Sequence, residues 1–147
     1  MSTTSPSFSP RTIALGSWVR IGLIATVTAI VAVLAAQLLA TRLWPEIVLF
    51  KPLDSYARSA LFVIVPGIGA TGLFAWLAQR SRQADTQFLR IAVVVLLVSI
   101  VPDYLLPVEH KTILASTVAA FLHVVAGIVI IAALTNGYRR MTGSGNR

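Results

Sequence analysis

The chain has 147 residues, of which 56% are hydrophobic and only 12% are charged. A soluble chain carries about 25% charged residues, so this composition excludes an ordinary water-exposed domain. Cysteine is absent, which excludes disulfide bonds, thiolate metal sites and catalytic thiols. The formal net charge of +7 falls in short clusters between long apolar runs, so we interpret it as a guide to topology and expect no nucleic-acid partner.

Three apolar segments have the length of membrane-spanning helices. Residues 1–17 are rich in Ser, Thr and Pro and are predicted to form a disordered tail. After this tail, residues 21–40, 59–78 and 112–135 contain no Asp, Glu, Lys or Arg. Each segment can cross about 30 Å of hydrocarbon as a helix, the expected structure because backbone groups in lipid must pair within the segment.

A further span, third in chain order, has weaker support. Residues 88–106 include Arg90 and Asp103, and the uncharged core of this segment covers only residues 91–102. Both charged residues lie near an end, where an arginine side chain can extend to the headgroups. Without this span, the basic loop around Arg80 and the basic tail of residues 137–147 would lie on opposite sides of the membrane. We therefore predict four spans.

The basic residues predict the orientation. One side carries eight arginines: Arg11, Arg20, Arg80, Arg82, Arg90, Arg139, Arg140 and Arg147. The other side carries four basic residues: Arg42, Lys51, Arg58 and Lys111. The positive-inside rule places the first side, with both termini, in the cytoplasm. The predicted fold class is an all-α bundle of four transmembrane helices, residues 18–136, in a plasma membrane. Trp and Tyr residues at the segment ends fit interfacial aromatic belts.

A cleaved signal peptide is an alternative interpretation of the first segment. Its apolar run exceeds the 7–15 residues that are usual in such peptides, and no Ala-x-Ala cleavage site follows it. We therefore favour a membrane span.

Small residues predict how the helices pack. Lipid tails are as apolar as leucine, so helix packing in lipid depends on close backbone approach and interhelical hydrogen bonds. The predicted packing positions are Gly67, Gly69, Gly72, Ala119 and Gly127. Residues 67–72 also match G-x-G-x-x-G, but a dinucleotide site needs a preceding strand, so we favour helix packing. Pro66 and Pro102 are expected to bend their helices.

The connection formed by residues 41–58 carries an apolar patch at residues 47–50, between two prolines. We expect this patch to rest in the lipid headgroup region. Capping of the helix bundle, or contact with a partner, is the alternative.

His123 is the main candidate for a functional residue, because ionisable groups inside a membrane span are rare and usually face the bundle interior. The first interpretation is a neutral imidazole that is hydrogen-bonded across helices, with Ser99, Gln37 or Thr28 as its partner. The second is a proton-relay or ligand-binding residue. The third is a haem ligand, which lacks a second axial ligand unless another copy supplies one.

Asp103 is the second candidate. It is expected to be an interfacial carboxylate paired with Arg58, Lys111 or His110, and a site where ions or protons enter is the alternative. Asp103, Glu109 and His110 resemble metal ligands in residue type, but their spacing does not support a metal site.

Three motifs carry a family resemblance. They are residues 72–78 before an arginine-rich loop, Ser99-Ile100-Val101-Pro102 at the end of the third segment, and residues 122–127 around His123. Together they resemble a family of small bacterial four-helix membrane proteins that is known only as a domain of unknown function. The resemblance implies four helices in a bacterial plasma membrane, and His123 matches a histidine in the fourth helix of that family. It implies no activity.

The sequence therefore favours a non-enzymatic membrane subunit that self-associates or accompanies a larger complex, with membrane lipids as further partners and no cofactor. The alternative is a protein that binds or transports a small lipophile, a proton or a cofactor at His123. An enzyme, with an active site built from Asp103, Glu109 and His110, is the third hypothesis.

Overall fold

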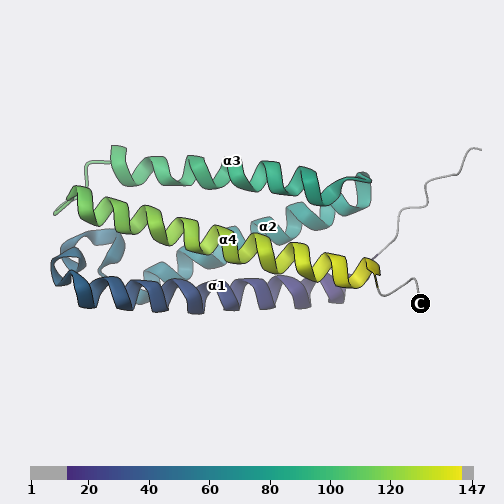
Figure 1. Cartoon of the computed structure of the whole chain (residues 1–147), viewed down its shortest axis with the longest axis horizontal. Coiled ribbons are helices and arrows are strands. Elements are labelled where there is room, and N and C mark those ends of the chain that lie inside the picture. The colour runs from purple at the N-terminus through teal and green to yellow at the C-terminus, as the bar shows by residue number, and fades with distance from the viewer. Residues whose placement is uncertain (1–12, 144–147) are drawn as a thin grey trace, which may run out of the picture.

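The structure is a computed structural model that describes residues 13–143. It contains four α-helices, α1 (Leu15–Leu43), α2 (Tyr56–Arg80), α3 (Ala84–Leu105) and α4 (Ile113–Gly143), and two short 3-10 helices, η1 (Pro45–Leu49) and η2 (Lys51–Leu53). The four long helices run side by side along one axis (Figure 1). We name the two ends of the bundle. The terminal end holds the start of α1, the α2–α3 turn and the end of α4, and the loop end holds η1, η2 and the α3–α4 connection.

All four helices are long and apolar enough to cross a membrane. They have 29, 25, 22 and 31 residues, and about 20 residues are needed. The prediction of an all-helical, four-helix fold is confirmed, including the weakly supported third helix. Most of the predicted N-terminal tail lies outside the described residues, as do residues 144–147. Its last three residues, 15–17, form the first turn of α1.

Helix starts have a local explanation. The Ser55 side chain accepts a hydrogen bond from the backbone N–H of Arg58, and the Thr112 side chain accepts one from that of Ala115. Both residues satisfy amide groups that the first turn of a helix leaves unpaired. They set the start of α2 and of α4 beside the loops at the loop end.

The helices pack unevenly. Helix α1 packs mainly against α4 and α2, and α3 packs mainly against α4. Ala25, Ala29, Ala115 and Ala119 are buried where small side chains let backbones approach. Helix α3 buries only Ala84 and Phe88, both near its start. It therefore stands apart from α2 over much of its length.

A reciprocal glycine–threonine contact joins α1 and α2. A Cβ atom added at Gly22 would lie 2.6 Å from Thr71 Cγ2, and one added at Gly67 would collide with Thr26 Oγ1. Gly22 and Thr26, like Gly67 and Thr71, are four residues apart and so share a helix face. Each glycine therefore makes room for the threonine of the facing helix. The sequence singled out Gly67 but missed Gly22.

The other predicted packing positions divide into two groups. Ala119 is buried, and a Cβ atom at Gly127 would lie 2.9 Å from Leu96 Cδ2. In contrast, no atom lies within 4 Å of a Cβ atom added at Gly69 or Gly72. The packing expectation for these two glycines is corrected, because they point away from the α1 contact that Gly67 makes.

Four aromatic rings, one from each helix, lie together near the terminal end. Phe74 stacks on Phe88 with ring centroids 4.4 Å apart, and its ring lies 5.6 Å from Trp18 and 5.0 Å from Tyr138. Trp18 is only 4% exposed. Its position at a helix end thus reflects core packing, and it gives no support for an aromatic belt.

The connection between α1 and α2 caps the bundle. Ile47, Phe50 and Leu53 are almost fully buried, and the buried Gln37 Nε2 donates a hydrogen bond of 3.0 Å to the Leu53 carbonyl. The expectation that residues 47–50 rest among lipid headgroups is corrected for Ile47 and Phe50, whereas Val48 and Leu49 are exposed. Two of these four side chains turn inward because η1 places Ile47 and Phe50 over the open end of the helices.

Candidate functional site

A cleft of about 590 Å³ lies between α2, α3 and α4. It exists because α3 stands apart from α2, and because the facing positions include residues as small as Gly69, Ala92 and Ala126. Pro66 of α2 and Pro102 of α3 also line it, each inside a continuous helix. The volume lies in the range of about 300–1,000 Å³ that is typical of small-molecule sites.

The cleft is polar only toward the loop end. Its polar lining residues are Ser59, Ser99, Asp103 and His123. Ser59 is in the first turn of α2, Asp103 is two residues before the end of α3, and His123 is on the half of α4 nearer the loop end. The half toward the terminal end is lined by apolar side chains such as Leu73, Phe88 and Ile130. The cleft is therefore amphipathic along its length.

His123 and Asp103 form the polar centre of the cleft. The imidazole Nδ1 of His123 lies 3.2 Å from Asp103 Oδ2 and 3.0 Å from the carbonyl oxygen of Ala119, one turn earlier on α4. The Asp103 side chain is 10% exposed and that of His123 is 39% exposed. Intramembrane ionisable groups usually pair with one another, and this pair joins α3 to α4.

The neighbours of Nδ1 define the tautomer of the neutral ring. The Ala119 carbonyl can only accept a hydrogen bond, so Nδ1 carries the proton and donates it. Asp103 Oδ2 is close to Nδ1 but has no aligned hydrogen bond from any described residue. In the neutral ring, Nε2 then has a free lone pair and no hydrogen-bond partner within residues 13–143. The site offers two acceptors, Nε2 and Oδ2.

The other residues proposed as partners of His123 lie elsewhere or bond elsewhere. Ser99 lines the same cleft, but its hydroxyl donates to the Leu96 carbonyl of its own helix. Gln37 holds the loop cap through Leu53, and Thr28 is exposed on α1. Ser99 thus shares the cleft with the pair, whereas Gln37 lies outside the cleft lining.

The charged residues of the connections at the loop end do not assemble with Asp103. Arg58 forms a 2.7 Å ion pair with Asp54, Glu109 pairs with Lys51 at 3.2 Å, and Lys111 donates to the carbonyls of Tyr104 and Leu106. The expected pairing of Asp103 with Arg58, Lys111 or His110 is therefore corrected. No group of three metal-ligating side chains occurs within residues 13–143. The hypothetical active site of Asp103, Glu109 and His110 is not assembled.

The sequence singles out both residues of the central pair but gives no direct sign that they contact each other. The position of Asp103 near the end of its span predicts an interfacial carboxylate, and this placed its expected partners among the charged residues of the connections and not on α4. The available signal was that Asp103 and His123 are ionisable residues on consecutive apolar helices, where such groups tend to pair.

Four bundled helices of membrane-spanning length, around an apolar cleft with one polar pair, indicate a protein of the multi-pass membrane class. The chain belongs to a family of unknown function, DUF6069, whose sequence profile matches residues 13–140. The predicted resemblance to a four-helix family of unknown function is thus confirmed. No curated protein and no solved structure matches the chain.

Proposed function

We propose that this protein binds a small lipophilic alcohol or phenol in the cleft between α2, α3 and α4, with the hydroxyl group at His123 and Asp103. In this proposal the protein spans a bacterial plasma membrane four times with both termini in the cytoplasm. The observation that carries the proposal is an apolar cleft of about 590 Å³ whose few polar groups gather at one end. This arrangement matches a ligand with an apolar body and one polar head.

The chemistry of the polar end selects the head group. With Nδ1 committed to Ala119, the neutral imidazole accepts a hydrogen bond at Nε2, and Asp103 Oδ2 is a second, buried acceptor without an aligned donor. A ligand hydroxyl supplies the missing donor, whereas an ether or ester oxygen does not. A buried polar atom without a partner costs about 1–3 kcal/mol, so the site favours ligands that donate.

The membrane orientation and the cleft are consistent with each other. If the termini are cytoplasmic, the polar end of the cleft lies toward the outer leaflet, and its apolar part extends from there toward the cytoplasmic side, as far as Phe88. A lipophilic alcohol takes the same orientation in a bilayer, because its hydroxyl stays near the headgroups. Such a ligand can reach the cleft from the lipid phase without turning over.

The hypothesis of a self-associating accessory subunit rested on faces of small residues. Ala25, Ala29, Ala119 and Gly67 of these faces are buried inside the single chain. They are therefore occupied by contacts within the bundle. Self-association and an accessory role stay predictions, and the cleft supports binding better.

The test compares two probes that differ in one hydrogen-bond donor. Labelled 4-nonylphenol is titrated into lipid nanodiscs that carry the full-length protein, with 4-nonylanisole, its methyl ether, as competitor. We expect saturable binding of the phenol. The ether should compete about tenfold more weakly than unlabelled 4-nonylphenol does, which corresponds to about 1.4 kcal/mol for one hydrogen bond. Absence of saturable binding, or equal affinity for both compounds, would refute the proposal.

Matched variants assign the effect to the site. His123→Asn should weaken phenol binding about tenfold through loss of one hydrogen bond. His110→Asn is the control, because His110 is exposed in the α3–α4 connection with a φ of 54°, a conformation that Asn tolerates. Equal losses in both variants would place the phenol outside the cleft.

A further inference from the structure

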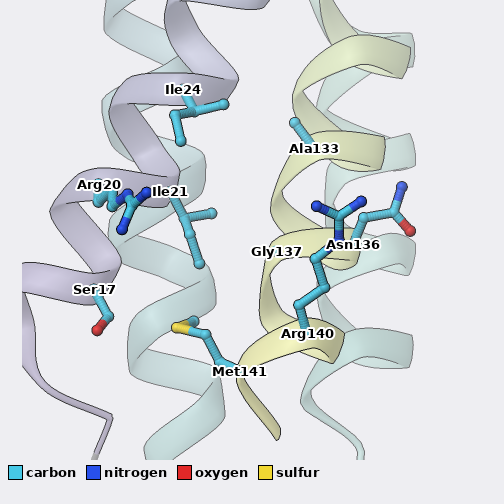
Figure 2. A pocket seen from close by; sticks show the side chains of 9 residues that line it. All are labelled: Ser17, Arg20, Ile21, Ile24, Ala133, Asn136, Gly137, Arg140 and Met141. Carbon is cyan, nitrogen blue, oxygen red and sulfur yellow. The ribbon is translucent and has the colours of Figure 1, made fainter. Parts of the chain in front are cut away.

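A second groove, of about 550 Å³, lies on the bundle surface between α1 and α4 at the terminal end (Figure 2). It is formed where the two helices meet at a glycine. A Cβ atom added at Gly137 of α4 would lie 2.7 Å from Ile21 Cγ2 of α1. The Met141 side chain reaches from α4 toward α1, as Figure 2 shows. Gly137 and Ile21 therefore form the floor of the groove.

The groove is basic at its outer part and apolar at its inner part. Arg20 of α1 and Arg140 of α4 line it near the helix ends, together with Ser17 and Asn136. Ile24, about one turn from Arg20, and Ala133, about two turns from Arg140, continue the groove into the bundle with apolar walls. This order, charge at the end and apolar surface further in, is the order of the parts of a phospholipid.

The two arginines lack a counter-charge from the protein. Arg20 and Arg140 are exposed, and neither forms an ion pair with an acidic residue within residues 13–143. Asp85 is the only acidic residue in the sequence near this end, because the other four lie in or beside the connections at the loop end. The groove therefore carries two positive charges that no acidic side chain within residues 13–143 neutralises through an ion pair.

We propose that this groove binds an anionic phospholipid, with the phosphate between Arg20 and Arg140 and an acyl chain along Ile24 and Ala133. Guanidinium groups match phosphate oxygens in geometry as well as charge, and basic pockets between membrane helices at the cytoplasmic side bind acidic headgroups. Ser17 and Asn136 add uncharged donors for the glycerol or phosphate oxygens. The proposal rests on the proposed topology, in which this end lies at the cytoplasmic surface, and is independent of the phenol site.

The experiment measures lipid selectivity directly. Full-length protein is reconstituted in phosphatidylcholine membranes, and spin-labelled phosphatidylglycerol and spin-labelled phosphatidylcholine are compared by the fraction of each that is immobilised at the protein. We expect phosphatidylglycerol to be preferred about fivefold, since two arginines attract an anionic headgroup and salt weakens this attraction at the membrane surface. A preference near one, which means that both lipids are immobilised equally, would overturn the proposal.

A charge-matched pair of variants separates the groove from general electrostatics. R20Q/R140Q should lower the preference for phosphatidylglycerol to nearly one. R90Q/R139Q removes the same charge from exposed arginines that do not line the groove, and this variant should keep most of the preference. Equal losses in both variants would overturn the proposal in favour of diffuse attraction. Flotation of each variant with liposomes tests membrane insertion separately, so failure to insert is distinguished from failure of the groove. The helical circular dichroism of each variant confirms its folding.

Discussion

The Asp103 carboxylate lies 3.2 Å from Nδ1 of His123, and this contact joins the end of α3 to the interior of α4. It connects the two ionisable residues of the cleft across a helix interface at which α3 is otherwise shallowly packed. The Ala119 carbonyl holds Nδ1 beside this carboxylate, which leaves Nε2 for a ligand. The polar end of the cleft is thus built by tertiary contact between two residues that are 20 positions apart.

The first prediction concerns the tautomer of His123. Because Nδ1 lies against the Ala119 carbonyl and the Asp103 carboxylate, the neutral ring should carry its proton on Nδ1 and not on Nε2. Nitrogen-15 NMR of histidine-labelled protein should show a protonated Nδ1 and an unprotonated Nε2. His110→Asn assigns the signals by removing the other histidine. A protonated Nε2 in the neutral ring would contradict the proposed acceptor site.

The second prediction concerns the glycine–threonine contact. Gly67→Ala should destabilise the bundle by about 1–3 kcal/mol, because the added methyl group collides with Thr26 in a packed interface. Gly72→Ala is the control on the same helix. With no atom within 4 Å, it should be neutral or slightly stabilising, since alanine favours helix. Thermal unfolding in a mild detergent measures both, and equal effects would contradict the interpretation.

The third prediction concerns the aromatic cluster. Phe74 contacts a ring from each of the other three helices, so Phe74→Ala should lower the free energy of unfolding by about 3 kcal/mol through the cavity left behind. Phe121→Ala removes the same atoms from a side chain that is 55% exposed, and should change stability much less. Unfolding in denaturant, followed by near-UV circular dichroism, compares the two. A small effect at Phe74 would mean that this end is not the stable core.

The fourth prediction concerns the loop cap. Gln37→Ala removes the hydrogen bond to the Leu53 carbonyl and should loosen η1 and η2, which raises amide hydrogen exchange in residues 47–53. The exposed Gln79 at the terminal end provides a control through Gln79→Ala. Exchange followed by mass spectrometry measures both variants. Unchanged exchange in Gln37→Ala would show that the buried side chains of Ile47 and Phe50 hold the loop alone.

The third helix is the part of the fold that the sequence supports least. Its charge-free core is short, yet the structure has a continuous helix through Arg90, Pro102 and Asp103. Arg90 is exposed near one end, and Asp103 finds a partner on α4. The sequence could not assign that partner, because pairing depends on how far α4 extends beside α3. The exposed Gly69 and Gly72 show the same limit for packing faces.

The sequence by itself determined four apolar helices, since helix length and the placement of charges depend only on local order along the chain. It also identified His123 and Asp103 as unusual, because an ionisable residue in an apolar segment is visible without a fold. Only the tertiary structure decided that these two side chains meet, that residues 47–50 cap the bundle, and that α3 stands apart from α2. Each of these depends on the relative rotation and depth of neighbouring helices, which contacts between distant residues set and which apolar periodicity leaves undetermined.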